Sequence, residues 1–389
     1  MENNRDHNIK HIGFITPEYP HAQIKQAAGI GTSVKNLVSS LVDQGIKVTV
    51  FVYQQELNSI EFDEGVELHL LQKKIYLAFG WYFHRKYINS YINKIVEKKN
   101  IEILEAPDWT GITAFMKFKI PLVIRLHGTD AYFCKLENRP QKKKNYLFEK
   151  MALQKASSLV APTRYAGEIS RTIFNLNSKS IHTIFNSIQA EKFVNDNSEV
   201  FDQNKIVYIG TLIRKKGVLE LSKIFNELIK IKPEATLVLI GSDSKDIETG
   251  STSTYELMIQ EFSEAAIKRV NYLGKVSYDE VKQHMKHAHV CVFPSLAETF
   301  GMVTVEAMAM QKAVISSKYG WSKEIIDNNI NGCLVDPKNH QLFATNINKL
   351  LSDKTICQKY GINAREKVLN TFDTKIVVLQ NINLYNSLL

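Results

Sequence analysis

Short β-branched runs alternate with longer amphipathic segments along the first half of this chain. The runs are HIGFIT (11–16), KVTVFVY (47–53), IEIL (101–104), PLVIRLHG (121–128), SSLVAPT (157–163) and IHTIFN (181–186). Strands that recur at such intervals, with helical segments between them, are typical of parallel sheets joined by crossover helices. The alternation therefore favours an α/β fold.

The pattern is interrupted once by a polar stretch, QAEKFVNDNSEVFDQNK, and then resumes. The later runs are KIVYIG (205–210), ATLVLIG (235–241), VNYLG (270–274), HVCVFPS (289–295) and AVISS (313–317). A chain of 389 residues also suits two domains better than one core. We expect two doubly wound, Rossmann-like domains facing a cleft, at 1–195 and 196–370. Residues 371–389 are expected to form a last helix, and packing on the N-terminal domain is one of its options.

The cysteine count, the apolar runs and the net charge limit the kinds of protein this chain can be. The four cysteines are scattered, without a C-x-x-C pair, which favours a reduced, cytoplasmic protein over a zinc site or a disulfide framework. The first ten residues do not resemble a signal peptide, and no run of 18 apolar residues occurs. The net charge of +9 predicts attraction to anionic partners without choosing among them.

Basic and aromatic residues are interleaved between Leu71 and Lys99, and a second basic stretch spans Arg139 to Lys150. One interpretation is a solvated helix face above a buried aromatic face; the other is a patch that binds an anionic membrane surface, peripherally on its inner face. No nucleic-acid partner is expected, because no helix-turn-helix, zinc-finger or RNP signature accompanies the charge.

The segment PSLAETFGMVTVEAMAM (Pro294–Met310) has only two charges, Glu298 and Glu306, in an apolar context. We expect a buried strand to end before it and Gly301 to release the chain into a helix. Ligands of such folds lie outside the carboxyl ends of strands. The first amides of this helix, near Thr299, Phe300 and Gly301, would be donors at the positive end of a helix dipole, which favours a phosphate there.

Glu306 is expected in the first or second turn of that helix, among apolar neighbours. A carboxylate in such a place is costly unless something hydrogen-bonds it, and the two adjacent hydroxyls of a ribose would do so. Glu298 would similarly accept hydroxyls of a sugar. The alternative is that each glutamate pairs with a basic residue or reaches water. Because the two residues flank an expected anion site, we favour the ligand interpretation.

A second motif, YIGTLIRKKGVLEL (Tyr208–Leu221), has the same order of strand, loop, glycine and helix. Its cations Arg214, Lys215 and Lys216 would neutralise a diphosphate, although a solvated turn is an equal alternative. No D-x-D pair is present to hold a divalent metal on a diphosphate. We therefore expect protein cations to act in its place and no metal or other cofactor.

The first domain offers weaker signals. QAAGIGTSVKNL (Gln26–Leu37) is expected to be a loop running into a helix, in which Gly29 and Gly31 permit close backbone approach. It lacks the third glycine of a dinucleotide fingerprint. His127 ends a strand directly before Gly128, so it is a candidate polar contact, although a lone histidine is more often structural.

Taken together, these motifs resemble family 4 of the retaining glycosyltransferases (glycosyl transferases group 1), with the GT-B fold, over nearly the whole chain. The most specific mark is the glutamate pair in PSLAETFGMVTVEAMA. The supporting marks, in the family's order, are TPEYP, AGIG, LHG, APT, IFNSI, IRKKG and YLGKVSYDEVKQHMKHAHVCVFPS.

The resemblance implies a role for each candidate residue. Glu306 would bind the ribose hydroxyls, and Glu298 and His127 would contact the donor sugar at the catalytic centre. Lys216, with Arg214 as the nearby arginine, would hold the diphosphate together with the amides of Thr299, Phe300 and Gly301. Gly29 and Gly31 would approach the diphosphate from the other domain. Members of the family usually need no metal.

The sequence also departs from the family pattern. Thr211 stands where an arginine usually follows the strand glycine. GSDS (Gly241–Ser244) replaces GxGP, and NSIQ (Asn186–Gln189) replaces NGVD. These changes leave the base and sugar contacts less defined than the phosphate site.

The resulting expectation is a metal-independent, retaining hexosyltransferase. It would move a sugar from a nucleoside diphosphate sugar, UDP rather than GDP, to a glycan or lipid-linked acceptor in surface polysaccharide or glycan assembly. The alternatives are a sugar-nucleotide epimerase, a glycoside phosphorylase, or a basic nucleic-acid or membrane-binding module.

Overall fold

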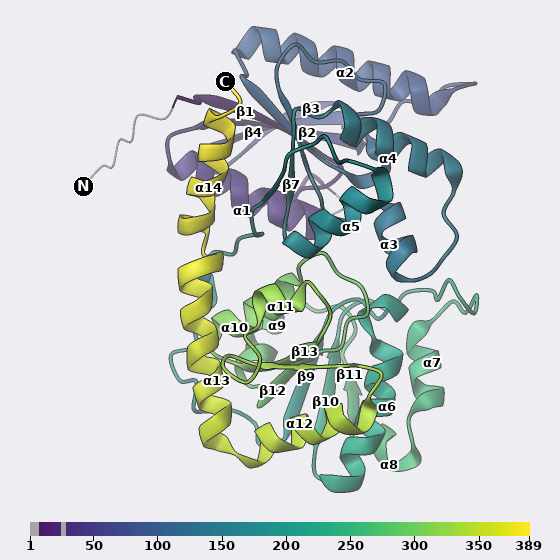
Figure 1. Ribbon diagram of the computed structural model, residues 1–389, viewed down its shortest axis with the longest axis vertical. Helices are drawn as coiled ribbons and strands as arrows, with labels where there is room; N and C mark the ends of the chain where they lie inside the picture. The colour runs from purple at the N-terminus through teal and green to yellow at the C-terminus, as the bar shows by residue number, and fades with distance from the viewer. Residues whose placement is uncertain (1–7, 25–28) are drawn as a thin grey trace. The chain divides into compact units, whose positions relative to one another are not determined.

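The computed structural model describes residues 8–24 and 29–389, and it divides the chain into two compact units. Unit 1 comprises the chain up to Ile188 together with Asp373–Leu389, and unit 2 comprises Gln189–Phe372. Figure 1 shows the elements of both. Each unit is described by itself below.

Unit 1 is built on an eight-stranded sheet with the order β3-β4-β2-β1-β5-β6-β7-β8. All neighbours pair in parallel except β3 and β4, which form an antiparallel hairpin. The strands are β1 (His11–Thr16), β2 (Lys47–Gln55), β3 (Ser59–Asp63), β4 (Val66–Gln72), β5 (Ile103–Pro107), β6 (Leu122–Arg125), β7 (Ser158–Ala161) and β8 (Ile181–Thr183).

The β3–β4 hairpin was not expected from the sequence. Its two-residue turn, Glu64 and Gly65, has positive φ at both positions, as tight hairpins require. Exposed and half-buried residues alternate along β3, which fits a strand at the edge of the sheet.

Helices cover both faces of this sheet. Residues of α1 and α14 share one apolar cluster with the strands, and residues of α2, α4 and α5 share another. The helices are α1 (Gly29–Asp43), α2 (Gly80–Lys99), α3 (Asp130–Leu136), α4 (Lys143–Lys155), α5 (Arg164–Phe174) and α14 (Thr374–Asn386). The last helix of the chain thus belongs to unit 1 and packs on its first (Figure 1).

Unit 2 has a six-stranded, fully parallel sheet with the order β11-β10-β9-β12-β13-β14. The strands are β9 (Lys205–Ile209), β10 (Thr236–Ile240), β11 (Val270–Tyr272), β12 (Val290–Phe293), β13 (Ala313–Ser317) and β14 (Cys333–Val335). The helices are α6 (Val218–Ile231), α7 (Thr254–Glu261), α8 (Glu264–Ile267), α9 (Tyr278–Lys286), α10 (Met302–Ala309), α11 (Ser322–Ile325), α12 (His340–Ser352) and α13 (Lys354–Lys367).

The strand order of unit 2 reverses between β9 and β12. From β9 the chain builds outward to β10 and β11, then returns to place β12 on the other side of β9. Loops after such a pair of strands diverge and leave a crevice at the carboxyl edge of the sheet. The motifs with Lys216 and Glu298 follow β9 and β12 respectively, so the topology brings them to this point.

Among the helices of residues 8–24 and 29–389, none has the length and apolar character needed to span a bilayer.

Candidate functional site

The segment after β12 places the two glutamates on either side of a left-handed glycine. Gly301 caps the start of α10 with φ of 96°, a value that favours glycine. Glu298 lies on the loop before it and Glu306 in the second turn of α10. Phe300 is buried with its ring against Phe372, at 5.6 Å between centroids, so only its backbone is available to a ligand.

Glu306 is a buried carboxyl group, exposing 6% of its surface. Val305 and Met308 beside it are fully buried, and the Tyr278 hydroxyl donates a hydrogen bond of 2.9 Å to its Oε1. Burial raises the pKa of Glu306 to about 7, and the Tyr278 hydrogen bond offsets only part of this. Sugar hydroxyls that donate to the carboxylate would favour its charged form.

The loop after β9 is bound directly to the loop after β12. The Lys215 carbonyl accepts hydrogen bonds from the amides of Leu296 (2.7 Å) and Ala297 (3.1 Å). Gly217, at φ of 70°, lies against Pro294 so closely that a Cβ would stand 1.9 Å from the Pro294 carbonyl oxygen. A glycine is therefore needed here both for conformation and for space.

This contact brings Lys216 and Glu298 together. The two side chains form an ion pair, and the Ser295 hydroxyl donates to the same carboxylate oxygen at 3.3 Å. The two residues are therefore neighbours, and each is a partner of the other in this structure. Their contacts with a donor stay a prediction. Their pairing also corresponds to the alternative of a glutamate neutralised by a basic residue.

Arg214 is held by acidic residues that the sequence analysis did not single out. Its guanidinium donates two hydrogen bonds, of 2.9 and 2.8 Å, to the buried Asp246 and lies 3.3 Å from Glu248. The pair holds the pKa of Asp246 well below its ordinary value. Two carboxylates thus offset the positive charge of Arg214, which leaves Lys216 as the cation beside Glu298.

In unit 1, Gly29 and Gly31 lie in the first turn of α1 rather than in a loop, and residues 26–28 of the expected loop fall outside the described ranges. The Gly31 amide donates to Glu18 Oε1 at 2.8 Å, and a Cβ at Gly31 would stand 3.2 Å from Glu18 backbone atoms. The close approach at Gly31 is therefore to the segment after β1. A Cβ at Gly29 would meet no atom of the described residues within 4 Å.

His127 follows β6 on a loop that two buried carboxylates hold. Asp108 accepts the amides of His127 (2.9 Å) and Gly128 (3.2 Å), and Glu149 accepts the amides of Asp130 (3.0 Å) and Ala131 (3.2 Å). Burial, with the nearby Arg125 charge, lowers the pKa of His127 to about 3. Its imidazole is therefore neutral at physiological pH.

Several of these partners could have been found from the sequence and others could not. Glu18 and Tyr278 stand inside TPEYP and YLGKVSYDEVKQ, which were already marked as similar to the family. Asp108, Glu149 and Asp246 stand in no motif, and only the fold brings them to their partners.

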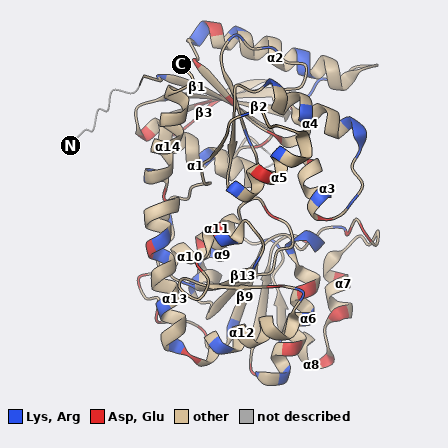
Figure 2. Ribbon diagram, in the orientation of Figure 1, with Lys and Arg blue, Asp and Glu red and all other residues tan. Residues whose placement is uncertain are grey.

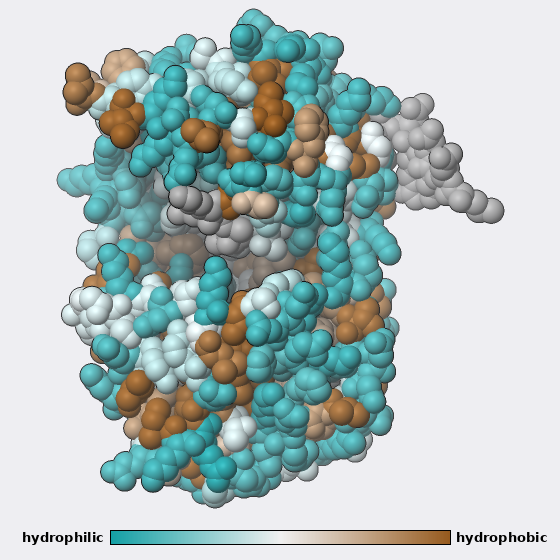
Figure 3. Space-filling view, turned by 180° about the vertical axis from the view of Figure 1, so that it is seen from behind, coloured by the Kyte–Doolittle hydropathy of each residue, from teal (hydrophilic) through white to brown (hydrophobic). Residues whose placement is uncertain are grey.

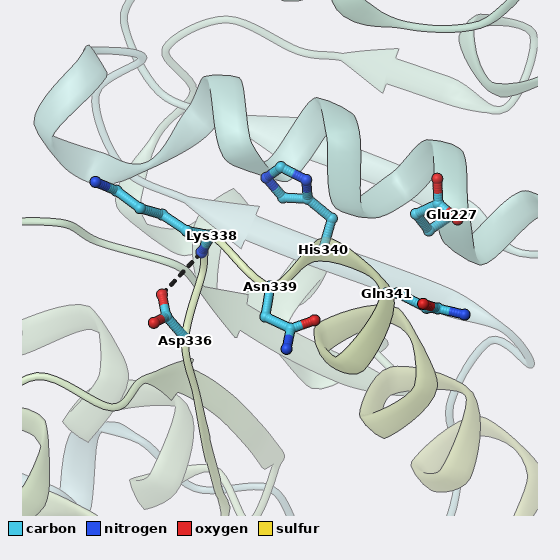
Figure 4. A pocket seen from close by; sticks show the side chains of 6 residues that line it. All are labelled: Glu227, Asp336, Lys338, Asn339, His340 and Gln341. Atoms are coloured by element: carbon cyan, nitrogen blue, oxygen red, sulfur yellow. Dashed lines mark hydrogen bonds between the residues drawn. The ribbon is translucent and has the colours of Figure 1, made fainter.

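A separate hollow of about 530 Å³ lies in unit 2 between α6 and the start of α12 (Figure 4). Its lining is polar and includes none of the candidate residues: Glu227, Asp336, Lys338, Asn339, His340 and Gln341. Across the described residues, no three His, Cys, Asp or Glu side chains are grouped so as to hold a metal ion. We assign no function to this hollow.

Comparison with known protein families matches two adjacent parts of the chain. Residues 27–192 match the model described as Glycosyltransferase Family 4, and residues 189–367 match Glycosyl transferases group 1. An uncharacterized glycosyltransferase of Methanocaldococcus jannaschii is 25% identical over 96% of this chain and 97% of its own length. The capsular polysaccharide biosynthesis glycosyltransferase CapM of Staphylococcus aureus is 27% identical over 63% of this chain and 65% of its own length.

Among solved structures, Anabaena HepE in complex with UDP is similar, with a TM-score of 0.74 and 18% identity, over 97% of this chain and 100% of that one. The same Anabaena protein has also been solved with UDP-glucose. At this identity the likeness shows the fold alone, which is the GT-B architecture of two Rossmann-like units expected from the sequence.

Proposed function

Because this chain belongs to the family 4 glycosyltransferases, as the matches over residues 27–192 and 189–367 show, we propose that it is a retaining transferase that uses a nucleoside diphosphate sugar. UDP is favoured over GDP, since HepE, of the same fold, has been solved with UDP and UDP-glucose. The acceptor is a hydroxyl group of a glycan or a lipid-linked glycan, in surface polysaccharide assembly. The relationship to CapM supports that setting.

The observation that carries this proposal is the buried carboxyl group of Glu306 in α10, whose pKa of about 7 leaves it half protonated near neutral pH. It shares the edge of the sheet with the Lys216–Glu298 pair, on loops that Gly217 and Lys215 hold together. A diphosphate near Lys216 and the start of α10, with its ribose on Glu306 and its sugar towards Glu298, satisfies all three groups at once.

In the proposed reaction the bond between the anomeric carbon and the diphosphate oxygen breaks while the acceptor oxygen bonds to the same face of that carbon. The acceptor proton passes to the leaving phosphate, so no side chain has to act as base. Lys216 and the amides of Thr299, Phe300 and Gly301 stabilise the negative charge that develops on the leaving group. Arg214, held in place by Asp246, adds to this stabilisation of the leaving diphosphate. The proposed reaction requires no metal or other cofactor.

Glu298 and His127 act on the donor sugar in this proposal. Glu298 binds sugar hydroxyls rather than attacking as a nucleophile, since donor binding releases it from Lys216 and its charge then needs donors. The neutral His127 is a suitable hydrogen-bond partner for a hydroxyl group. In this proposal the first turn of α1, at Gly29 and Gly31, also binds the diphosphate. We place the protein in the cytoplasm, where its four free, buried cysteines remain reduced.

The test is thermal stabilisation by UDP, GDP and ADP, each with EDTA or with magnesium. We expect one nucleotide, UDP, to raise the melting temperature equally with either addition. Glu306→Gln should weaken that binding about tenfold or more, whereas Glu264→Gln, at an exposed glutamate of the same unit, should leave it unchanged.

Turnover with the corresponding nucleotide sugars then decides the reaction type. Anomeric retention in the glycoside product, seen by NMR, supports the proposal, and inversion contradicts it. A free epimerised nucleotide sugar would indicate an epimerase, and a requirement for inorganic phosphate a phosphorylase. The absence of any nucleotide effect would remove the proposed role of Glu306.

A further inference from the structure

Unit 1 contains a pocket of about 530 Å³ at the carboxyl edge of its sheet. It lies beyond the ends of three parallel strands, β2, β4 and β5, and against the first turns of α2. None of the donor-site candidates lines it. Its lining residues are Gln54, Lys73, Lys74, Ile75, Tyr76, Gly80, Trp81, His84, Arg85, Thr110 and Ile112.

The pocket is walled by apolar and aromatic side chains that a local cluster holds in place. The Trp81 ring packs on Phe148 and Phe115, with centroids 4.9 and 5.3 Å away. Tyr76 packs on Phe83 at 5.6 Å. Aromatic packing of this kind fixes the start of α2 and makes the pocket a formed feature of the unit.

Arg85 is a buried cation without a carboxylate partner among the described residues. It exposes 8% of its surface, and its terminal nitrogens donate to the carbonyls of Trp81, Thr110 and Gly111, while its Nε finds no acceptor in the described part of the chain. Both ring nitrogens of His84 are likewise buried, and neither has a hydrogen-bond partner within residues 8–24 and 29–389. Such unsatisfied groups are costly, and burial lowers the pKa of both side chains.

The charge around the pocket has one sign. Lys73 and Lys74 stand on its rim beside Arg85, and no Asp or Glu is among the described residues that line it. Lys and Arg positions continue along α2 (Figure 2). An anion would satisfy Arg85 and His84 and offset this charge, and a phosphate group offers the required acceptors.

Large apolar side chains project into solvent immediately before α2. Leu77 is fully exposed, and Ile75 and Phe79 expose 92% and 68% of their surfaces. In Figure 3 brown residues mark this projecting corner of unit 1, at the upper left. Adjacent exposed apolar residues flanked by lysines are typical of segments that enter the headgroup boundary of an anionic membrane.

We propose that this pocket binds the phosphate group of a lipid-linked acceptor, while Ile75, Leu77 and Phe79 contact its hydrocarbon chain or the surrounding membrane. The acceptor role rests on the proposed glycosyl transfer. The phosphate recognition does not, since it follows from the pocket's own charges. The apolar rim separates this ligand from free phosphate, which would gain nothing from three exposed hydrocarbon side chains.

The test measures binding of three probes to the full-length protein: dihexanoylphosphatidic acid, dihexanoylphosphatidylcholine and inorganic phosphate. We expect the phosphatidic acid to bind about tenfold or more tightly than either of the others. Vesicles of equal parts phosphatidylglycerol and phosphatidylcholine should likewise sediment with the protein, whereas pure phosphatidylcholine vesicles should not.

The test uses variants of the residues at the rim of the pocket rather than of Arg85. Arg85 also donates hydrogen bonds to three backbone carbonyls, so its replacement would disturb the fold. Leu77→Ser with Phe79→Ser, and separately Lys73→Glu with Lys74→Glu, should each weaken phosphatidic acid binding about tenfold. The matched controls are Ile231→Ser, at a half-exposed position in unit 2, and Lys359→Glu, at an exposed one. Neither control should change binding.

Equal binding by the rim variants and the native protein would overturn the proposal. Inorganic phosphate that binds as tightly as phosphatidic acid would overturn its lipid part, and equal sedimentation with neutral vesicles would overturn its charge part. UDP stabilisation measured on the same variants separates this site from the donor site. Loss of lipid binding with UDP binding intact locates the effect in this pocket, whereas failure of UDP alone would refute only the proposed transfer.

Discussion

The carboxyl group of Glu306 is buried with fewer hydrogen-bond donors than its charged form needs. Its carboxyl group has one described hydrogen-bond donor, Tyr278, in surroundings too apolar to stabilise a full charge. With a pKa raised to about 7, it is divided between its two protonation states near neutrality. Two ribose hydroxyls would supply the hydrogen-bond donors that the fold does not provide. Glu306 therefore favours ligand binding, whereas its burial lowers the stability of the folded protein.

The cost of Glu306 should appear as a pH dependence of stability. In the unfolded chain it releases its proton near its ordinary pKa of 4.5, whereas in the folded state it keeps the proton up to about 7. Between these values the folded state binds more protons, so stability falls as pH rises, by up to roughly 3 kcal/mol, and is constant above 7. Glu306→Gln removes this loss.

This loss of stability can be measured by urea unfolding of the native protein and of Glu306→Gln at intervals from pH 4.5 to 8. We expect Glu306→Gln to gain stability relative to the native protein as pH rises to 7, and no further above it. Asp108 and Glu149, whose pKa values burial also raises to about 7, titrate in both proteins and cancel in the difference. A difference that does not change with pH would show that the Glu306 carboxyl is not destabilised by burial.

Sequence reasoning at this scale identified groups but not their partners. The two glutamates stood out because charge is rare in an apolar segment. Asp246 and Asp108 did not, since a carboxylate is ordinary in a polar loop until the fold places an arginine or a pair of amides against it. Contacts between residues far apart in sequence, such as Arg214 with Asp246, have no local signal.

At the scale of elements, the site is two loops joined at one glycine. Gly217 lets the loop after β9 lie against Pro294, and the Lys215 carbonyl then captures two amides of the loop after β12. The position of Lys216 beside Glu298 therefore depends on a residue that has no side chain. Both motifs have the order strand, glycine and helix, and parallel strands end at a common edge of the sheet, so the two loops lie close together. The Lys216–Glu298 contact itself was not predicted from the sequence.

Gly217→Ala should disturb this junction more than the backbone strain alone would. A left-handed alanine costs about 1–2 kcal/mol, and here its Cβ would also overlap the Pro294 carbonyl. We expect a loss of roughly 3 kcal/mol or more in the free energy of unfolding, together with weaker nucleotide stabilisation.

Gly250→Ala is the matched control, because Gly250 has φ of 79° and its added Cβ would meet nothing within 4 Å. The free energy of unfolding of Gly250→Ala should fall only by the about 1–2 kcal/mol of a left-handed alanine, and nucleotide binding should be unchanged. Equal losses in the two variants would mean that the two loops are not held together at Gly217.

The strands missed by the sequence analysis lack a clear signal for different reasons. β3 is an edge strand along which exposed and half-buried residues alternate, and β14 has only three residues, so neither forms an apolar run. β4 is largely buried and was missed all the same, whereas the edge strands β8 and β11 were predicted. The central strands are buried on both faces and read as continuous apolar runs, which is why they were predicted close to their observed bounds.

At the scale of the whole molecule, unit 1 is built from both ends of the chain. Helix α14 returns after unit 2 and inserts polar groups into the first sheet. Tyr385 donates to Glu105 Oε2 at 2.7 Å, and Asn381 accepts from Arg125 at 2.6 Å. Arg125 and Glu105 are themselves a buried ion pair. The sequence predicted this helix but left its docking site open, because its packing partners lie more than 200 residues away.

Because α14 packs on unit 1, we expect a destabilising substitution in α14 to affect distant residues of unit 1 and to leave unit 2 unchanged. Tyr385→Ala in the full chain leaves a cavity and removes a donor from the buried Glu105, at a cost of roughly 4 kcal/mol. Hydrogen exchange followed by mass spectrometry should show faster exchange in peptides from α1, β5 and β6. Peptides from Gln189–Phe372 should be unchanged, because that unit has its own core.

Ile376→Ala is the control in the same helix, since Ile376 is 40% exposed and its truncation removes little buried surface. It should leave exchange in β5 and β6 near the native rate. Faster exchange spread evenly over both units after Tyr385→Ala would mean that they unfold together. Faster exchange confined to the first 188 residues and α14 would instead show that the stability of unit 1 depends on the last helix, whereas unit 2, which is one continuous segment, is stable without that contact.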